Sequence, residues 1–469
     1  MSAPRLAVRA VELYEWPFKL RLPFRFGVIT VTHGRQAVAR VRIRTDAGRE
    51  AWGFAAEGLA AKWFDKDLAL SDEQNLDQLR RALELAREAY LAAGSNTAFG
   101  HYADHYAAQI AAGAKLGLNP LVASFGPALL DRAVLDALCR SLGVSFYDAV
   151  RRNLVGLGPH GIVPDLVGFD FQQLLASLTP APSIHFRHTV GLVDPIATAE
   201  TRVSDGLPET LAEVVATYGH RYFKLKVGGD VKADVARLAE IAAVLDARPR
   251  PYHATLDGNE QYADADSVLE LWQAMRAERR LARLMRSILF IEQPIKRQVT
   301  LSASVEALAR EKPVIIDESD GEVDAFPRAR VLGYTGVSSK ACKGIYKSML
   351  NLARCRSWGG RYFMSAEDLS TKAGTAVQQD LALVNLLGLT HVERNGHHFI
   401  DGFSGRPEAE ARDFLAAHPD LYHLQDGKVR IRIRDGVVQL GSLDRSGYAL
   451  GATPDIAAMQ PMPPARWPS

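Results

Sequence analysis

Few cysteines and no long apolar run characterise the sequence. Three cysteines, Cys139, Cys342 and Cys355, occur among 469 residues, and so small and odd a number excludes a disulfide framework. No stretch of about 18 apolar residues that could cross a bilayer is present. Residues 1–20 carry scattered charges and lack the apolar core of a signal peptide. We therefore expect a cytoplasmic protein with reduced thiols and no membrane contact.

The sequence also lacks an excess of either charge. Its 56 lysines and arginines nearly balance 54 acidic residues, giving a formal net charge of +2, so nothing in the composition favours nucleic acid as a partner. Hydrophobic residues make up 47% and charged residues 23% of the chain. These values are typical of a folded globular protein and exclude disorder, collagen and coiled coil for most of its length.

Changes of pattern divide the chain into four segments. The stretch SDEQNLDQLRRALELAREAYLAAG, from Ser71, predicts a capped helix after several strands. Near the C-terminus, KVRIRIRDGVVQL predicts a hairpin with its turn at Asp435-Gly436. The segments are 1–150, a small α+β domain; 151–183, a connection or insertion; 184–400, the catalytic domain; and 401–469, which is expected to pack back on the first domain.

From Ile184 onward, short apolar runs that end in polar residues alternate with helix-like stretches. Eight runs occur, and their polar ends recur every 23–35 residues, close to the β-α unit of an eightfold barrel. An open doubly wound sheet is the competing interpretation, but the glycine-rich phosphate turn typical of that fold is lacking. The sequence thus predicts an α/β fold with a closed parallel barrel. The polar ends are Lys226, Asp257, Glu292, Asp317, Lys340, Glu367 and Glu393.

Three successive predicted strands end in carboxylates, Asp257, Glu292 and Asp317. In a parallel barrel the strand ends converge on one face, where three carboxylates repel one another unless a cation lies between them. Oxygen ligands suit a hard ion, Mg²⁺ before Mn²⁺ or Ca²⁺. Salt-bridged strand ends or helix caps are the alternative, and they explain one such acid more easily than three.

Lysines lie on both sides of these acids. Lys224 and Lys226 share one face of the strand before Asp257, and Lys340 ends the strand after Asp317. Partial burial and a like-charged neighbour lower the pKa of a lysine, which a general base requires. The KLK stretch alone could equally belong to a solvated edge strand, but Lys340 makes the arrangement more specific.

The order and spacing of these motifs resemble the enolase superfamily, over nearly the whole chain. Lysines on the second and sixth barrel strands are similar to the muconate lactonizing enzyme subgroup of the mandelate racemase/muconate lactonizing enzyme family. The seventh strand end, MSAED, lacks the histidine expected of the mandelate racemase subgroup. The matching stretches are KLK at 224–226, LDGNEQY at 256–262, FIEQPI at 290–295, IIDES at 315–319, SKACKG at 339–344, DRAVLDALCRSLG at 131–143 and PFRFGVITVTHG at 23–34.

The resemblance implies a modified TIM barrel, of (β/α)₈ or (β/α)₇β type, closed by an α+β capping domain that the N-terminal part and the C-terminal segment build together. It implies a small-molecule carboxylate substrate, bound Mg²⁺, and removal of the proton α to the carboxylate to give a metal-stabilised enolate. Racemisation or epimerisation, elimination (dehydration) or cycloisomerisation could follow. A homo-oligomer is implied as well. The implied roles are metal ligation by Asp257, Glu292 and Asp317, proton transfer by Lys226 and Lys340 on opposite faces, and support of Lys226 or of the substrate carboxylate by Lys224.

Other residues near the expected barrel mouth have alternative assignments. Lys343 is a rival to Lys340, because ACKGIYK replaces the double glycine that is more usual there. Glu393 could contact substrate or pair with Arg394. Residues that could support the ligands or touch substrate are Asn259, Glu318 and Glu367, and capping-loop residues where specificity could reside are Phe24, Phe26, Thr30, His33 and Trp63.

Two other functions stay open. A Schiff-base lyase could use Lys226 or Lys340 as its nucleophile, and a catalytically silent barrel could bind a metal and serve in binding or assembly. His397 and His398 follow the eighth strand and could reach the barrel mouth. A loop pair with no catalytic role is the simpler interpretation of these histidines.

Overall fold

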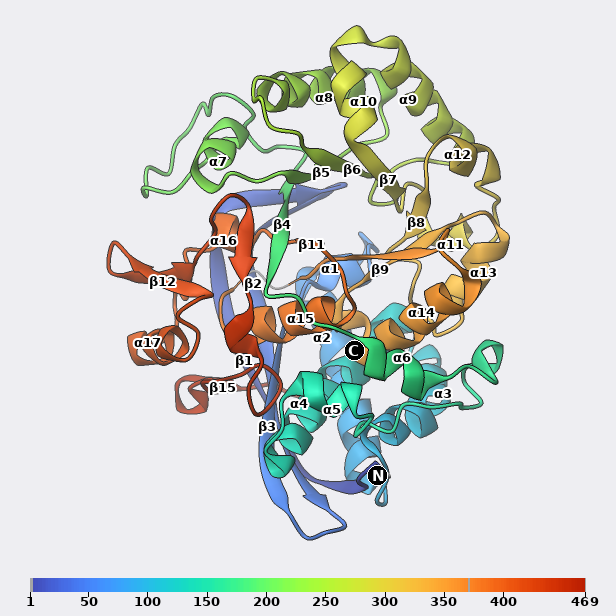
Figure 1. Ribbon diagram of the computed structural model, residues 1–469, viewed down its shortest axis with the longest axis vertical. Coiled ribbons are helices and arrows are strands. Elements are labelled where there is room, and N and C mark those ends of the chain that lie inside the picture. The colour runs from blue at the N-terminus through green and yellow to red at the C-terminus, as the bar shows by residue number, and fades with distance from the viewer. Residues whose placement is uncertain (1–2, 370–371, 469) are drawn as a thin grey trace.

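The computed structural model describes residues 3–369 and 372–468 and contains a barrel with a capping domain beneath it (Figure 1). The predicted fold class, an α/β barrel with an α+β capping domain, is confirmed. No helix within these residues combines the length and the apolar character needed to cross a bilayer.

An antiparallel sheet and three long helices form the capping domain. In the second strand, buried Val41 and Ile43 alternate with Arg40, Arg42 and Arg44, so one face meets the helices and the other meets water. A methyl group added at Gly53 would lie 2.2 Å from the Ala133 carbonyl oxygen, which explains the glycine where helix and sheet touch. The sheet order is β15-β1-β2-β3. The elements are β1 (Leu6–Phe26), β2 (Ile29–Thr45), β3 (Glu50–Gly58), β15 (Gln460–Pro461), α1 (Ala61–Phe64), α2 (Asp72–Ala92), α3 (Ala98–Lys115) and α4 (Pro120–Leu142).

Eight parallel strands form the barrel. Their order is β10-β9-β8-β7-β6-β5-β4-β11, and β10 and β11, at its two ends, lie beside each other. Because every strand runs in the same direction, all eight carboxyl ends open on one face. The strands are β4 (Ser183–Val190), β5 (Tyr222–Lys226), β6 (His253–Asp257), β7 (Ile288–Glu292), β8 (Val314–Ile316), β9 (Gly336–Ser339), β10 (Phe363–Ala366) and β11 (His391–Glu393).

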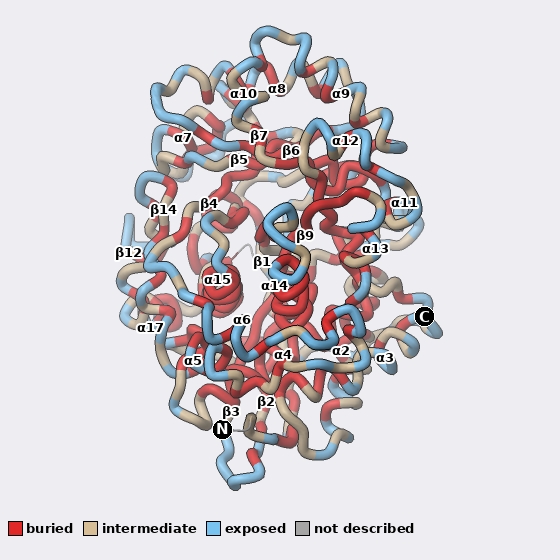
Figure 2. The backbone as a smooth tube through the Cα atoms, turned by 45° about the vertical axis from the view of Figure 1, so that its right-hand side comes forward, coloured by how far each residue is buried: buried red, intermediate tan, exposed pale blue. Residues whose placement is uncertain are grey.

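Helices follow the barrel strands. Two of them, α14 and α15, lie between the strands and the capping domain and are buried on nearly every side (Figure 2). A helix without a solvent face needs no polar stripe. The helices are α7 (Leu211–Tyr218), α8 (Val231–Asp246), α9 (Ala265–Ala277), α10 (Ala282–Ser287), α11 (Arg297–Thr300), α12 (Glu306–Glu311), α13 (Ala325–Val331), α14 (Ile345–Trp358), α15 (Thr375–Leu386) and α16 (Gly396–Phe399).

The two remaining segments link the domains. In the C-terminal part, β15 pairs with β1 and the Trp467 indole donates to the Leu116 carbonyl, so the chain returns to the capping domain. The elements are α5 (Phe146–Arg151) and α6 (Phe171–Ser177) before the barrel, and α17 (Glu408–Ala417), β12 (Tyr422–Gln425), β13 (Lys428–Ile431) and β14 (Val437–Gln439) after it.

The predicted hairpin turn at Asp435-Gly436 forms, but its pairing is short. Both residues have positive φ, and Arg434 and Val437 pair across the turn as an antiparallel bridge. Beyond that bridge, β13 pairs with β12 and β14 pairs with the barrel strand β4. Burial explains the outcome, because Val438 becomes fully buried beside β4.

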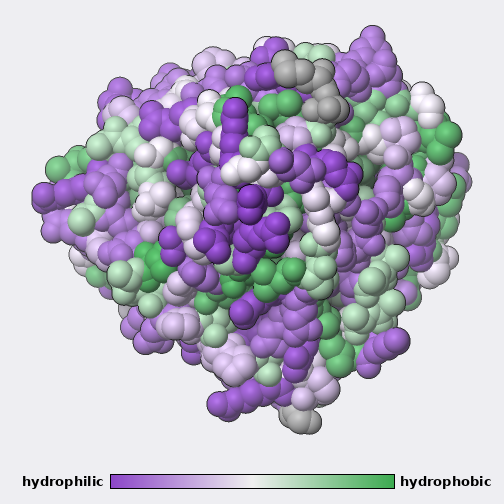
Figure 3. All heavy atoms as spheres, turned by 90° about the horizontal axis from the view of Figure 1, so that it is seen from below, coloured by the Kyte–Doolittle hydropathy of each residue, from purple (hydrophilic) through white to green (hydrophobic). Residues whose placement is uncertain are grey.

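The surface seen from below is mostly hydrophilic, with apolar residues in small patches between polar ones (Figure 3). The apolar side chains are concentrated instead in one core that continues from the capping sheet into the barrel.

Candidate functional site

The polar residues predicted at the strand ends meet at the carboxyl-end mouth of the barrel. In the parallel register, Lys226 lies opposite Asp257 and Asp257 lies opposite Glu292. Asp317, Lys340 and Glu367 follow directly on β8, β9 and β10, and Glu393 ends β11. All of these side chains belong to residues at most 8% exposed. The mouth is therefore a buried, highly charged site.

Lys224 lies at the centre of the acids. Burial disfavours its charged form, but the surrounding carboxylates outweigh burial and raise the pKa of Lys224 well above its ordinary value. The sequence placed this lysine beside Lys226, whereas its ammonium is shared by acids from four strands. The distances from Lys224 Nζ are 2.7 Å to Asp257 Oδ2, 2.7 Å to Glu367 Oε2, 3.1 Å to Glu393 Oε2 and 3.2 Å to Glu292 Oε1.

Lys226 and Lys340 flank the acids from opposite sides. Lys226 Nζ lies 2.5 Å from Asp257 Oδ2, and Lys340 Nζ lies 2.5 Å from Asp317 Oδ2. The ring of Trp63, from the capping domain, lies 4.3 Å from Lys340 Nζ. Two amines thus face one space from β5 and β9.

Carboxylates also decide the pKa of Lys340. Burial lowers the pKa of Lys340, but Asp317 and Glu367 outweigh burial and raise it well above the ordinary value. The like-charged Lys224 has a smaller opposing effect. These carboxylates favour the ammonium form of Lys340.

Three carboxylates form a group that fits a divalent cation. Oxygens of Glu292, Asp317 and Glu367 lie within 4.8 Å of one another. Burial and the facing Glu367 carboxylate raise the pKa of Glu292 well above its ordinary value, as expected for acids that compete for too little positive charge. An all-oxygen, multiply charged donor set suits a hard cation such as Mg²⁺. The residues present therefore fit the metal that the sequence suggests.

This group differs from the predicted ligand set. Glu292 and Asp317 belong to both sets, while Glu367 takes the third place and Asp257 contacts Lys224 and Lys226 instead. The ammonium of Lys224 lies between the acids and draws Asp257 toward itself. The strand-end pattern had marked Glu367 as a polar end but not as a neighbour of the other two acids.

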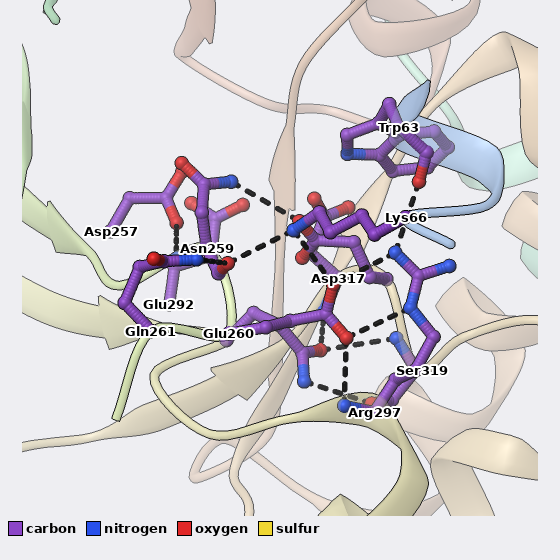
Figure 4. A network of polar contacts seen from close by, with 12 residues as sticks. Trp63, Lys66, Asp257, Asn259, Glu260, Gln261, Glu292, Arg297, Asp317 and Ser319 are labelled. Atoms are coloured by element: carbon purple, nitrogen blue, oxygen red, sulfur yellow. Dashed lines mark hydrogen bonds and ion pairs between the residues drawn. The ribbon is translucent and has the colours of Figure 1, made fainter. Parts of the chain in front are cut away.

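Residues behind the acids connect the barrel to the capping domain (Figure 4). The backbone N–H of Asn259 donates to Asp257 Oδ1 at 2.9 Å, and its side chain donates to Glu318 at 3.1 Å. Lys66, which follows α1, lies 3.0 Å from Glu318 Oε1 and 2.7 Å from Glu260 Oε2. The capping segment is thus tied to the loops after β6 and β8.

Lys343, the rival to Lys340, lies on the other side of Asp317. Its Nζ is 3.2 Å from Asp317 Oδ1 and 3.1 Å from the Asp317 carbonyl oxygen, and it also donates to the Ser338 carbonyl. It therefore supports Asp317 from behind, while Lys340 contacts the opposite oxygen, Oδ2.

Glu393 pairs with Lys224 and not with Arg394. It also accepts a hydrogen bond from Thr189, while Arg394 pairs with Asp368 and Asp380. The alternative that Glu393 simply neutralises its chain neighbour is wrong.

Sequence reasoning missed Arg187. This β4 residue points into the barrel, donating to Ser365 Oγ at 3.0 Å and lying 3.6 Å from Glu367 Oε1. The signal was the alternation of Arg187 and Thr189 within IHFRHTV, which puts both side chains on one face of the strand.

Comparisons with known proteins agree with this architecture. The chain matches the family described as enolase C-terminal domain-like over residues 206–440, half of its length. No curated protein sequence matches it.

Solved structures resemble the chain over nearly its whole length, at identities that show the fold alone. A dipeptide epimerase from Enterococcus faecalis V583, complexed with Mg and L-Leu-L-Tyr, is 15% identical with a TM-score of 0.59, covering 94% of this chain and 99% of that one. A muconate lactonizing enzyme from Mycobacterium smegmatis, complexed with muconolactone, is 18% identical with a TM-score of 0.57, covering 96% and 98%. A mandelate racemase/muconate lactonizing protein from Herpetosiphon aurantiacus is 15% identical with a TM-score of 0.57, covering 94% and 97%.

The family match, the barrel and the acids at the strand ends lead to one conclusion. The chain belongs to the enolase superfamily, a group of isomerases and lyases with metal-dependent enolate chemistry.

Proposed function

We propose that the protein is a Mg²⁺-dependent racemase or epimerase that moves the proton α to the carboxylate of a small molecule. The observation that carries this proposal is the placement of Lys226 and Lys340 on opposite sides of the acid cluster, each 2.5 Å from an acid oxygen. Two amines on opposite faces suit removal of a proton from one face and its return to the other.

The acids would hold the cation, which supplies positive charge for the substrate carboxylate and for the charge that develops as the α proton leaves. Glu292 and Asp317 belong to both the predicted and the observed group, so they are the firmest candidates. Asp257 and Glu367 compete for the third place. We propose that Asp257 turns from Lys224 toward the cluster when the site is loaded.

The lysines would carry the proton. In one direction Lys226 takes the α proton and Lys340 returns a proton to the opposite face; in the other direction the two exchange roles. Lys224, equidistant from Asp257 and Glu367 at 2.7 Å, would hold the acids in place and neutralise part of their charge. The α carbon thus loses and regains one proton, and no other reactant is consumed.

A Schiff-base lyase that uses Lys226 or Lys340 is the alternative. Borohydride trapping of the protein with a carbonyl substrate would support it, and dependence on the metal would argue against it. Residence in the cytoplasm and a homo-oligomeric state stay predictions.

Proton NMR in D₂O tests the proposal. We would incubate the protein and Mg²⁺ with dipeptides first, because the Enterococcus faecalis structure is of a dipeptide epimerase, and then with N-acylamino acids, hydroxy acids and sugar acids. We expect an α-proton signal to disappear with Mg²⁺ and to persist with EDTA. Epimerisation adds the signals of the second diastereomer, whereas elimination or cyclisation adds those of a new compound.

Variants separate the roles of the two lysines. Lys226→Ala and Lys340→Ala should each abolish epimerisation, and each should retain exchange from only one configuration of the substrate. Lys232→Ala, an exposed lysine on α8, is the control and should behave like the unmodified protein. Exchange that survives EDTA, or that both lysine variants retain for both configurations, would contradict the proposal. Bound Mg²⁺ without exchange of any substrate would favour the silent barrel.

A further inference from the structure

A second cluster of metal-ligating side chains lies outside the barrel lumen. His188 belongs to β4, His220 lies between α7 and β5, and His397 belongs to α16. One ring nitrogen from each of the three lies within 4.8 Å of the others. Three segments far apart in the sequence therefore bring imidazoles to one point.

This cluster is separate from the acid cluster. On β4, Arg187 and Thr189 point into the lumen and contact Glu367 and Glu393. His188, between them, therefore points to the opposite face, toward α7 and α16. The ring of His397 lies 5.8 Å from that of Phe186, which shares this outer face, and 5.0 Å from that of Tyr218 at the end of α7.

The imidazole nitrogens lack partners among the residues that the structure describes. Nδ1 of His188 and both ring nitrogens of His397 and His220 are buried without a hydrogen bond of good geometry, although the Phe186 backbone lies near the His220 ring. All three residues are at least nine-tenths buried. Buried polar atoms normally have a partner, and three histidines with free nitrogens at one point need a shared one.

Their protonation state and surroundings suit a metal. Burial lowers the pKa of His220 to about 4, and burial with the neighbouring histidines holds the pKa of His188 and His397 well below the ordinary value. The rings are thus neutral at pH 7 and keep a lone pair for coordination. His397 also lines a cavity together with Thr217, Tyr218 and His423, which provides a route from solvent.

We propose that His188, His220 and His397 form a second metal site, specific for a borderline cation such as Zn²⁺ and distinct from the Mg²⁺ site of the acids. Imidazole nitrogen suits Zn²⁺, whereas carboxylate oxygen suits Mg²⁺. In tetrahedral Zn²⁺ coordination the ligand nitrogens are about 3.3 Å apart, so the rings close the remaining gap by small rotations. A water from the cavity beside His397 takes the fourth position.

A metal bound at this site would restrict the motion of α16, on which the β1–β2 hairpin of the capping domain rests. The ring of Phe399, in α16, lies 4.8 Å from that of Phe24 in β1, and Arg21 of β1 donates to the His398 carbonyl at 2.9 Å. A metal that joins α16 to β4 fixes the surface on which the hairpin rests.

Metal titration of the whole protein tests the site. After removal of all metal with a chelator, Zn²⁺ would be titrated against a chromophoric competitor, and Co²⁺ would be added separately for its absorption spectrum. We expect one tight Zn²⁺ per chain and the intense visible bands of tetrahedral Co²⁺. The spectrum requires no variant and so stands even where a substitution disturbs folding.

Variants assign the site to the histidines. His220→Gln and His397→Gln should each weaken Zn²⁺ binding by at least about 100-fold, the upper end of what losing a mere supporting partner costs. His423→Gln, which changes a histidine of the same cavity outside the cluster, and Asp317→Asn, which changes the acid cluster, should both retain it. In hydrogen exchange, Zn²⁺ should protect residues 396–400 and 18–31.

Three outcomes would overturn the proposal. The first is a stripped protein that binds no Zn²⁺ more tightly than a surface histidine does. The second is a weak, octahedral Co²⁺ spectrum typical of oxygen ligands. The third is Zn²⁺ binding that Asp317→Asn abolishes while both histidine variants keep it.

Discussion

At the scale of single residues, the environment of each buried lysine decides its charge. Lys224 and Lys340 lie against carboxylates, which raise the pKa of both amines. Lys372, in the chain between β10 and α15, has no hydrogen-bond partner among the described residues and lies 5.7 Å from the Trp16 ring. Burial, with a smaller effect of Arg406, lowers the pKa of Lys372 to about 7.

The lowered pKa of Lys372 predicts that its contribution to the free energy of unfolding rises with pH. Between pH 7 and the ordinary lysine pKa of about 10.4, the unfolded chain binds this proton and the folded chain does not, so raising the pH favours folding. Lys372→Met removes the penalty, which is fully present below pH 7, and should raise the thermal unfolding midpoint more at pH 7.5 than at pH 9.5. The gain over the unmodified protein should shrink by pH 9.5. Thermal unfolding followed by circular dichroism at both pH values measures this difference in midpoint.

A constant difference between Lys372→Met and the unmodified protein would contradict this. Lys312→Met is the matched control, because burial alone lowers the pKa of Lys312 and that amine donates to the Ile288 carbonyl. The change in unfolding midpoint that Lys312→Met causes should vary less with pH.

At the scale of elements, a short capping segment reaches across to the barrel. Lys66 pairs with Glu260 and Glu318, and Arg297 of α11 donates to Glu260 and to the carbonyls of Trp63 and Phe64. Burial opposes the charge of Lys66, but Glu318 and Glu260 outweigh it and raise the pKa of Lys66. These contacts hold Trp63 beside Lys340.

Removal of this link should loosen the capping segment. Lys66→Met leaves the buried Glu318 carboxylate without its ion-pair partner, which is costly, while Glu260 keeps Arg297. Backbone amides of residues 61–70 should therefore exchange with D₂O at least about tenfold faster, the effect of about 1.4 kcal/mol on local opening. Hydrogen exchange with mass spectrometry measures this. Lys62→Met should change exchange less, because within the described part of the chain its amine bonds to carbonyls of its own segment, Asp67 and Leu70. Equal protection in both variants would show that Lys66 does not hold the segment.

At this scale the sequence predicted local features, namely where strands end and which side chains share a face. The spacing of apolar runs located the strand ends, and alternation within a strand placed Lys224 and Lys226 on one face. The four partners of Lys224 come from β6, β7, β10 and β11, so they depend on how distant strands meet across the lumen. The Asp435-Gly436 turn was recognisable from its residues, but burial of Val438 beside β4 decided what the next strand paired with.

At the scale of the whole molecule, the barrel concentrates buried charge at one mouth. Glu292 ends β7, Asp317 follows β8 and Glu367 follows β10, and all three are buried. Lys224, Lys340, Lys343 and Arg187 lie against these acids. The carboxylates repel one another, and a cation bound between them by the folded state alone should stabilise the entire protein.

Mg²⁺ should therefore raise the thermal unfolding midpoint, and EDTA should reverse the rise. Binding to the folded state alone raises the free energy of unfolding by about 2.7 kcal/mol when free Mg²⁺ is 100 times its dissociation constant. Glu292→Gln keeps the shape of the side chain and removes its charge, so the metal-free variant should unfold near the midpoint of the unmodified protein and respond little to Mg²⁺. Glu393→Gln also removes a carboxylate that contacts Lys224, but from outside the group of three, and should keep the response. If Mg²⁺ stabilised Glu292→Gln as strongly as the unmodified protein, the cation would be bound elsewhere and the three acids would lose their assignment as its ligands.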